Sequence, residues 1–391
     1  MSIYVMHCAV VICVCLAGGA FAADAPAISG LPAEARLPDP FLRADGTRIA
    51  TRAEWTAQRA WLAQLIQRDA YGTVPPAGGP VGAVDGASST PDGIAGSERT
   101  IALTCGPGGA FTVDVVLTTP TGNGPFPVIV VGDLCWKRLA TPIVQAVITR
   151  GYALAEFDRT RIARDDKEAL LPLGTAFPGN DAGAVAAWAW GFQRVIDHLL
   201  TRPEIDRTRV IATGHSRGGK AVLLAGALDE RIALVAPNNS GCMGAGCSRF
   251  AHDGEGVERI TRVFPHWFAA RLRGFIEQLD RLPFDQHTLK ALVAPRPLLS
   301  TEGLGDAWAN PRGTQITFQA AREVYRFLGA EAAIGIVYRP GGHEHGLADF
   351  TALLDFADLQ LRGKPSPRKF DELAFDPATV DYFTWSAPAA K

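Results

Sequence analysis

One serine of this chain lies in a pattern that activates a hydroxyl for nucleophilic attack. Residues 209–220 read RVIATGHSRGGK, so a β-branched run leads into Gly214-x-Ser216-x-Gly218 and then into a segment with helical character. In such a turn between a strand and a helix, the serine backbone is strained and its hydroxyl is lifted above the sheet, while the glycines let strand and helix approach each other. The pattern therefore predicts Ser216 as a catalytic nucleophile.

A serine hydroxyl is a weak nucleophile at neutral pH, and it needs a general base that is itself oriented by an acid. In this arrangement the acid and then the histidine follow the serine in the chain, each in a loop after a strand. Asp306 follows the strand that starts near residue 296 and is the favoured acid; Glu302, at the strand end, is the alternative and is expected to hydrogen-bond the loop. His343 comes directly after Gly341-Gly342 at the end of the last strand, and we favour it over His345 as the base.

The other six histidines receive no catalytic role. His7 lies in a segment expected to be removed, and the side chain of His215 is expected to point away from the site. The remaining four lie in a predicted helix or a predicted insertion: His198, His252, His266 and His287. A metal pair at His343 and His345 is disfavoured because no third ligand accompanies it, so we expect neither a metal nor a cofactor.

The segments that position these residues alternate between strand and helix. After a loop over 75–97, β-branched runs predict strands at 100–104, 112–118, 128–131, 153–157, 209–213, 232–236, 298–301 and 334–338. Helical periodicity predicts helices at 54–69, 142–150, 182–200, 218–228, 314–328 and 347–361. Two hairpin-like strands followed by this alternation predict an α/β fold with a mostly parallel central sheet and helices on both faces.

The N-terminus has the pattern of a cleavable signal peptide over residues 1–22. An apolar run over 8–17 precedes the small-residue site Ala20-Phe21-Ala22, and about ten apolar residues are too few to cross a membrane. We expect residues 23–391 to form a single domain in which 241–295, the longest stretch without a predicted strand, is an insertion near the active site. The protein is therefore expected to be secreted or periplasmic.

Charge and cysteine content narrow the partners. The chain has 38 basic and 40 acidic residues in 391, which argues against a nucleic-acid or membrane-surface binder. Four cysteines remain after removal of the leader: Cys105, Cys135, Cys242 and Cys247. They allow three pairings, of which Cys242 with Cys247 is the obvious local one, and no CxxC or HExxH spacing suggests zinc. We expect a monomer.

Several segments together resemble a known family. They are GHSRGGK at 214–220, LDERIAL at 228–234, PNNSG at 237–241, YGTVP at 71–75, FPHWF at 264–268 and LPFDQHTLKALVAPRP at 282–297. Over about residues 50–365 the chain resembles the glucuronoyl esterases of carbohydrate esterase family 15. The resemblance implies a secreted α/β-hydrolase that cleaves esters between 4-O-methyl-glucuronic acid of glucuronoxylan and lignin alcohols without a cofactor.

The resemblance also implies roles for residues near the serine. Arg217 would help to form the oxyanion hole together with its own backbone N–H, which would stabilise charge that develops in the transition state. Lys220 would hydrogen-bond sugar hydroxyls, and the Trp308 ring would lie against the sugar face. Glu255, in the insertion, would contact the uronate.

Two positions depart from the family pattern. The family's cysteine before the serine is His215 here, so any disulfide made by that cysteine is missing. Many members place the catalytic acid where this chain has Asn239, and an amide cannot offset the charge of an imidazolium. Other members use an acid after the later strand, the place of Asp306.

These observations predict a serine esterase of (4-O-methyl-)D-glucuronic acid esters, with a glucuronoxylan or lignin–carbohydrate ester as its substrate. Two alternatives stay open. The first is an esterase of another plant cell-wall ester, either acetyl or feruloyl. The second is a catalytically inactive carbohydrate-binding α/β-hydrolase, which the missing acid at Asn239 suggests.

Overall fold

The computed structural model describes residues 25–168, 170–250, 254–376 and 382–389. The predicted signal peptide at 1–22, with its cleavage site, lies outside these residues, as does His252. No helix in the described ranges is both long and apolar enough to span a membrane.

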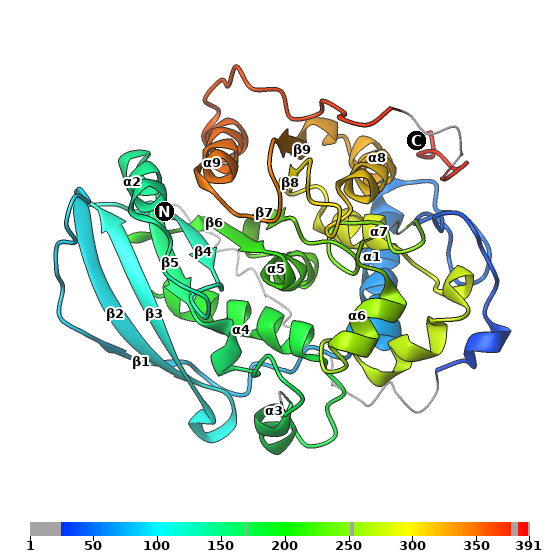
Figure 1. Cartoon of the computed structure of the whole chain (residues 1–391), viewed down its shortest axis with the longest axis horizontal. Helices are drawn as coiled ribbons and strands as arrows, with labels where there is room; N and C mark the ends of the chain where they lie inside the picture. The colour runs from blue at the N-terminus through cyan, green and yellow to red at the C-terminus, as the bar shows by residue number, and fades with distance from the viewer. Residues whose placement is uncertain (1–24, 169, 251–253, 377–381, 390–391) are drawn as a thin grey trace, which may run out of the picture.

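Within these described ranges, nine strands form a single sheet in the order β1-β2-β3-β5-β4-β6-β7-β8-β9. The first three strands pair antiparallel and form a twisted ribbon at one end (Figure 1), whereas β4 to β9 pair in parallel. The strands are β1 (Gly82–Asp85), β2 (Gly96–Cys105), β3 (Phe111–Pro120), β4 (Phe126–Val131), β5 (Ala153–Phe157), β6 (Ile205–His215), β7 (Ile232–Asn238), β8 (Leu298–Gly303) and β9 (Ile334–Arg339).

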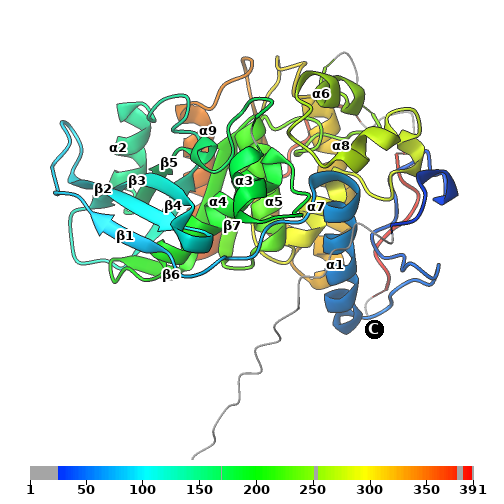
Figure 2. The same ribbon diagram turned by 90° about the horizontal axis from the view of Figure 1, so that it is seen from below.

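Helices cover both faces of the sheet. Helices α2 and α9 pack together on one face, while α4 and α5 lie on the other (Figures 1 and 2). The helices are α1 (Arg52–Ile66), α2 (Thr141–Thr149), α3 (Leu171–Ala176), α4 (Ala184–Leu199), α5 (Arg217–Leu228), α6 (Val257–Val263), α7 (Gln286–Val293), α8 (Pro311–Leu328) and α9 (Leu347–Arg362). The chain therefore has the α/β-hydrolase architecture that the sequence predicts.

Alternation along the parallel strands divides the core into two layers. In β4, Val128 and Val130 join the cluster beneath α4 and α5, whereas Ile129 and Val131 join the cluster beneath α2 and α9. Successive side chains of a strand point to opposite faces, so a strand covered on both sides is apolar throughout. This is why the parallel strands read as unbroken apolar runs in the sequence.

One expectation about the elements needs correction, and one segment holds helices that were not predicted. Residues 82–85, expected in a loop, form β1, which pairs with β2 although all four residues are exposed. Such an edge strand carries no apolar alternation, and it is held by its ladder with β2 and by ion pairs of Asp85 with Arg99 and Arg202. Segment 241–295 contains helices α6 and α7, which the periodicity did not indicate, and α7 packs on α5 and α8.

The cysteines of the described residues are all unpaired, including Cys242 and Cys247. The side chains of the local pair that the sequence allows lie in different apolar clusters. Cys242 packs in the main core, whereas Cys247 packs with Leu37 and Ile316.

Candidate active site

The nucleophile turn has the geometry that its sequence predicts. Strand β6 ends at His215, Ser216 has φ 54° and ψ −122°, and α5 begins at Arg217. A Cβ on Gly214 would lie 2.8 Å from the Gly218 backbone, so strand and helix can meet only through glycine. Because the first amides of α5 have no intrahelical acceptor, the turn presents N–H donors beside the serine.

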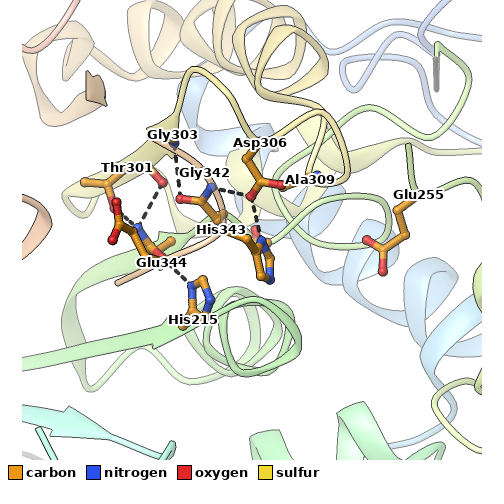
Figure 3. A network of polar contacts seen from close by, with 12 residues as sticks. His215, Glu255, Thr301, Gly303, Asp306, Ala309, Gly342, His343 and Glu344 are labelled. Carbon is orange, nitrogen blue, oxygen red and sulfur yellow. Dashed lines mark hydrogen bonds and ion pairs between the residues drawn. The ribbon is translucent and has the colours of Figure 1, made fainter. Parts of the chain in front are cut away.

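Asp306 and His343 meet, as expected for an acid and a base. His343 Nδ1 lies 2.6 Å from Asp306 Oδ2, while Asp306 Oδ1 accepts from the Ala309 N–H at 3.1 Å (Figure 3). Burial opposes ionisation of Asp306, but the hydrogen bonds from His343 and Asn239 outweigh it and lower the pKa of the carboxyl. The carboxylate thus leaves the Nε2 atom of His343 available to other partners.

Backbone contacts between two loops produce this meeting. Leu304 N donates to Arg339 O at 2.9 Å, and Gly305 N donates to Gly341 O at 2.8 Å. The buried Arg339 guanidinium bonds Asp349 through Nε at 2.8 Å and Glu344 through Nη1 at 3.0 Å, which fixes the start of the His343 loop. The candidate acid and the candidate base are therefore held by residues at the ends of β8 and β9.

Glu302, the alternative acid, is fully buried and does not reach the histidine. Within the described residues neither of its carboxylate oxygens has a hydrogen-bond donor, so the expected bond to the loop is absent. Burial raises the pKa of Glu302 well above its ordinary value and lowers that of its buried neighbour Lys290.

His215 lies against the catalytic candidates instead of pointing away. Its ring centroid is 4.4 Å from that of His343, and its Nδ1 lies 2.6 Å from Asn238 Oδ1. Burial, reinforced by the neighbouring His343, lowers the pKa of His215 to about 4, so the ring is neutral at neutral pH. Because His215 directly precedes Ser216, the contact between the two rings places His343 next to the turn that carries Ser216. No Ser216–His343 hydrogen bond is present among the described residues, and such bonds are often long without substrate.

Arg217 is held by an ion pair that the sequence does not reveal. Its Nη1 lies 2.6 Å from Asp165 Oδ2, and its guanidinium lies 4.7 Å from the centroid of a Trp267 ring. Asp165 also accepts from His266 Nε2 at 3.0 Å and from Trp267 Nε1 at 2.8 Å. Asp165 therefore joins the insertion to the start of α5, and no local motif marks it.

Lys220, Glu255 and Trp308 lie in one connected group beside the acid's turn. The Lys220 ammonium is 1% exposed and donates to Ser240 O, Cys242 O and Glu255 Oε2, each at 2.6 Å. These three acceptors occupy all the N–H donors of Lys220, whereas the expected role requires a donor for the sugar. Glu255 N donates to Trp308 O at 3.0 Å, and Arg259 lies over the half-buried Trp308 ring at 4.5 Å. Figure 3 shows Glu255 and Glu344 on opposite sides of His343.

A second buried acidic residue supports the Ser216 turn from the end of β4, the strand next to β6. Asp133, after β4, accepts the His215 N–H at 2.7 Å and pairs with the buried Arg159. A Cβ on Gly218 would lie 2.1 Å from Asp133 Oδ1, so this glycine makes room for the carboxylate. Sequence reasoning missed Asp133; an acid directly after a buried strand was the available signal.

The parallel sheet, the strained serine between strand and helix, and the carboxylate–imidazole pair after the last two strands together define an α/β-hydrolase. Comparison with known proteins narrows this class. Residues 105–329 match the family described as "Glucuronyl esterase, fungi".

Similar proteins cover most of the chain. The 4-O-methyl-glucuronoyl methylesterase 1 of Wolfiporia cocos is 33% identical over 89% of this chain and 84% of its own length. The 4-O-methyl-glucuronoyl methylesterase of Podospora anserina is 32% identical over 82% of this chain, which spans 66% of that relative. A solved carbohydrate esterase family 15 glucuronoyl esterase from Caldicellulosiruptor kristjansonii has a TM-score of 0.77 at 33% identity, covering 90% of this chain and 97% of its own.

The chain belongs to the glucuronoyl esterase family, a family of carboxylic ester hydrolases.

Proposed function

We propose that the chain is a secreted serine esterase that hydrolyses esters of (4-O-methyl-)D-glucuronic acid, such as those linking glucuronoxylan to lignin. The observation that carries the proposal is the 2.6 Å contact between Asp306 and His343 beside the strained Ser216. The names of the relatives, 4-O-methyl-glucuronoyl methylesterases, support glucuronic acid as the acid component of the substrate ester. The protein acts as a monomer without metal or cofactor.

The first half-reaction transfers the uronoyl group to the enzyme. The Ser216 Oγ attacks the ester carbonyl while His343 Nε2 takes the hydroxyl proton, and Asp306 stabilises the resulting imidazolium. The oxyanion is held by the Arg217 backbone N–H at the start of α5, with the guanidinium nearby. The bond to the alcohol oxygen then breaks, and His343 returns the proton to the leaving alcohol.

The second half-reaction releases the acid. Water attacks the acyl-enzyme, His343 takes its proton, and the bond to Ser216 Oγ breaks as that oxygen regains a proton. In this scheme Lys220 and Glu255 shape the sugar side of the site as a buried pair, because the donors of Lys220 are already occupied. Trp308 offers an apolar ring to the sugar face.

Turnover of benzyl glucuronoate tests the proposal, with Ser216→Ala as the control that abolishes it. Hydrolysis of p-nitrophenyl acetate in preference to the glucuronoate would favour an acetyl esterase, and preference for a feruloyl ester would favour a feruloyl esterase. Absence of labelling by a serine-directed fluorophosphonate would favour the inactive carbohydrate-binding alternative, because only an activated serine reacts.

A further inference from the structure

The side chain of Asn239, directly after β7, is held at both ends. Its Oδ1 accepts from the Gly303 N–H at 3.2 Å, and its Nδ2 donates to Asp306 Oδ2 at 2.5 Å. The backbone N–H bonds Thr301 O at 3.0 Å, and the residue is 1% exposed. Its φ is 41°, in the left-handed region that asparagine tolerates better than most residues. The amide therefore has one orientation, with its donor end toward the carboxylate.

The oxygen that Asn239 contacts is the one that accepts from His343. Asp306 Oδ2 receives Asn239 Nδ2 at 2.5 Å and His343 Nδ1 at 2.6 Å. Figure 3 shows the contact between Asp306 and His343. We propose that Asn239 is a positioning residue that fixes the carboxylate of Asp306 in the orientation that His343 requires. This inference rests on the proposed function.

An amide suits this position better than a second acid. Two carboxylates at 2.5 Å could not both be ionised, because like charges this close force one of them to keep a proton. Asn239 instead supplies an N–H donor, so Asp306 stays ionised and its carboxylate stays oriented toward His343. Asn239 thus cannot act as the catalytic acid itself, but it supports Asp306 in that role.

The charges around Asp306 predict what loss of the amide does. His343 and His215 face the carboxylate from the β9 and β6 ends, and the buried Glu302 faces it from β8. Arg339 donates to Gly342 O in the loop that carries His343. Without Asn239 the carboxylate becomes more basic and retains the His343 proton more strongly. The acidic limb of the kcat profile therefore moves to higher pH.

The experiment replaces Asn239 by glycine, which accepts the positive φ while removing the amide. We expect kcat for benzyl glucuronoate to fall about ten- to hundredfold, KM to change little, and the acidic limb to shift upward. Gln58→Ala is the matched control: this buried amide donates to Pro40 O and Leu42 O, away from Asp306. It should lower Tm without moving the pH profile.

The isosteric Asn239→Asp gives a second readout if the glycine variant does not fold. A second carboxylate should share a proton with Asp306 and move the acidic limb further upward. A folded Asn239→Gly or Asn239→Asp protein with wild-type kcat and an unmoved limb would overturn the inference alone. A wild-type protein that hydrolyses no glucuronoate ester would instead refute the proposed function.

Discussion

Replacement of Asp306 by asparagine separates charge from shape at the proposed acid. All three polar neighbours of this carboxylate are N–H donors: Asn239 Nδ2 and His343 Nδ1 at Oδ2, and Ala309 N at Oδ1. An amide has a single acceptor oxygen, so at least one of these donors must face an NH₂ group. The substitution therefore costs hydrogen bonds as well as charge.

Each orientation of the new amide impairs catalysis. If the NH₂ group faces His343, Nδ1 must become the acceptor, and Nε2 then carries a proton and cannot take one from Ser216. If the oxygen faces His343, the tautomer is kept but the imidazolium has no compensating charge. We expect Asp306→Asn to lower kcat by roughly three to four orders of magnitude, which corresponds to about 4–5.5 kcal/mol in the barrier.

The assay is kcat and KM for benzyl glucuronoate, with Glu302→Gln as the control. Glu302 is buried near the end of β8, the strand that precedes Asp306. Because the pKa of Glu302 is raised, glutamine resembles its neutral form. We expect Glu302→Gln to retain most of the activity. Retention of more than a tenth of kcat by a folded Asp306→Asn protein, or an equal loss at Glu302, would refute the assignment of Asp306 as the acid.

Stability at low pH gives an independent check. The hydrogen bonds from His343 and Asn239 hold the pKa of Asp306 below its ordinary value of 3.8, despite burial. The unfolded chain therefore binds the proton first, so this contribution to stability is complete above pH 3.8 and is lost as pH falls through the folded value. The Tm of Asp306→Asn should depend less on pH in that window than the wild-type Tm.

Three further outcomes follow from the packing around the site. Glu255→Gln leaves the buried Lys220 without its counter-charge, so urea unfolding should show a free energy of unfolding lower by about 3 kcal/mol; an unchanged value would contradict the buried pair. Gly218→Ala places a Cβ 2.1 Å from Asp133 Oδ1, so we expect a loss of about 1–3 kcal/mol in the same measurement, and unaltered stability would show that the turn can relax. The pKa of His215 is about 4 in the folded protein against an ordinary 6.5, so the unfolded chain binds this proton more readily and the wild-type Tm falls as pH drops from 6.5 to 4. His215→Gln should show a shallower fall of Tm over this range, and parallel curves would count against a buried neutral ring.

Local pattern was sufficient to predict most of the fold. The parallel strands are apolar on both faces, so each reads as a short β-branched run, and the strand–helix alternation excludes most other architectures. Strand β1 was not predictable, because its residues are exposed and its pairing with β2 is its main support. Helix α7 is buried at every position, so it has no one-sided apolar stripe, and α6 has only seven residues, too few for its periodicity to stand out.

The site divides in the same way. Ser216 could be predicted as the nucleophile from the sequence because the turn itself requires glycine on both sides. Asp306 and His343 could be predicted as its partners because each follows a strand in a fixed order. Their contact remained a prediction, since residues 37 positions apart meet only when β8 and β9 pair.

Tertiary structure alone decided which groups surround those three residues. Asn239 contacts Asp306, Asp165 contacts Arg217, and the Lys220 donors are occupied by protein acceptors. Hydrogen bonds between groups on different loops depend on distance and direction in space, and one-dimensional spacing carries neither. The residue types and their order in the sequence therefore indicate the chemistry available to this chain, whereas the contacts of the neighbouring residues depend on the fold.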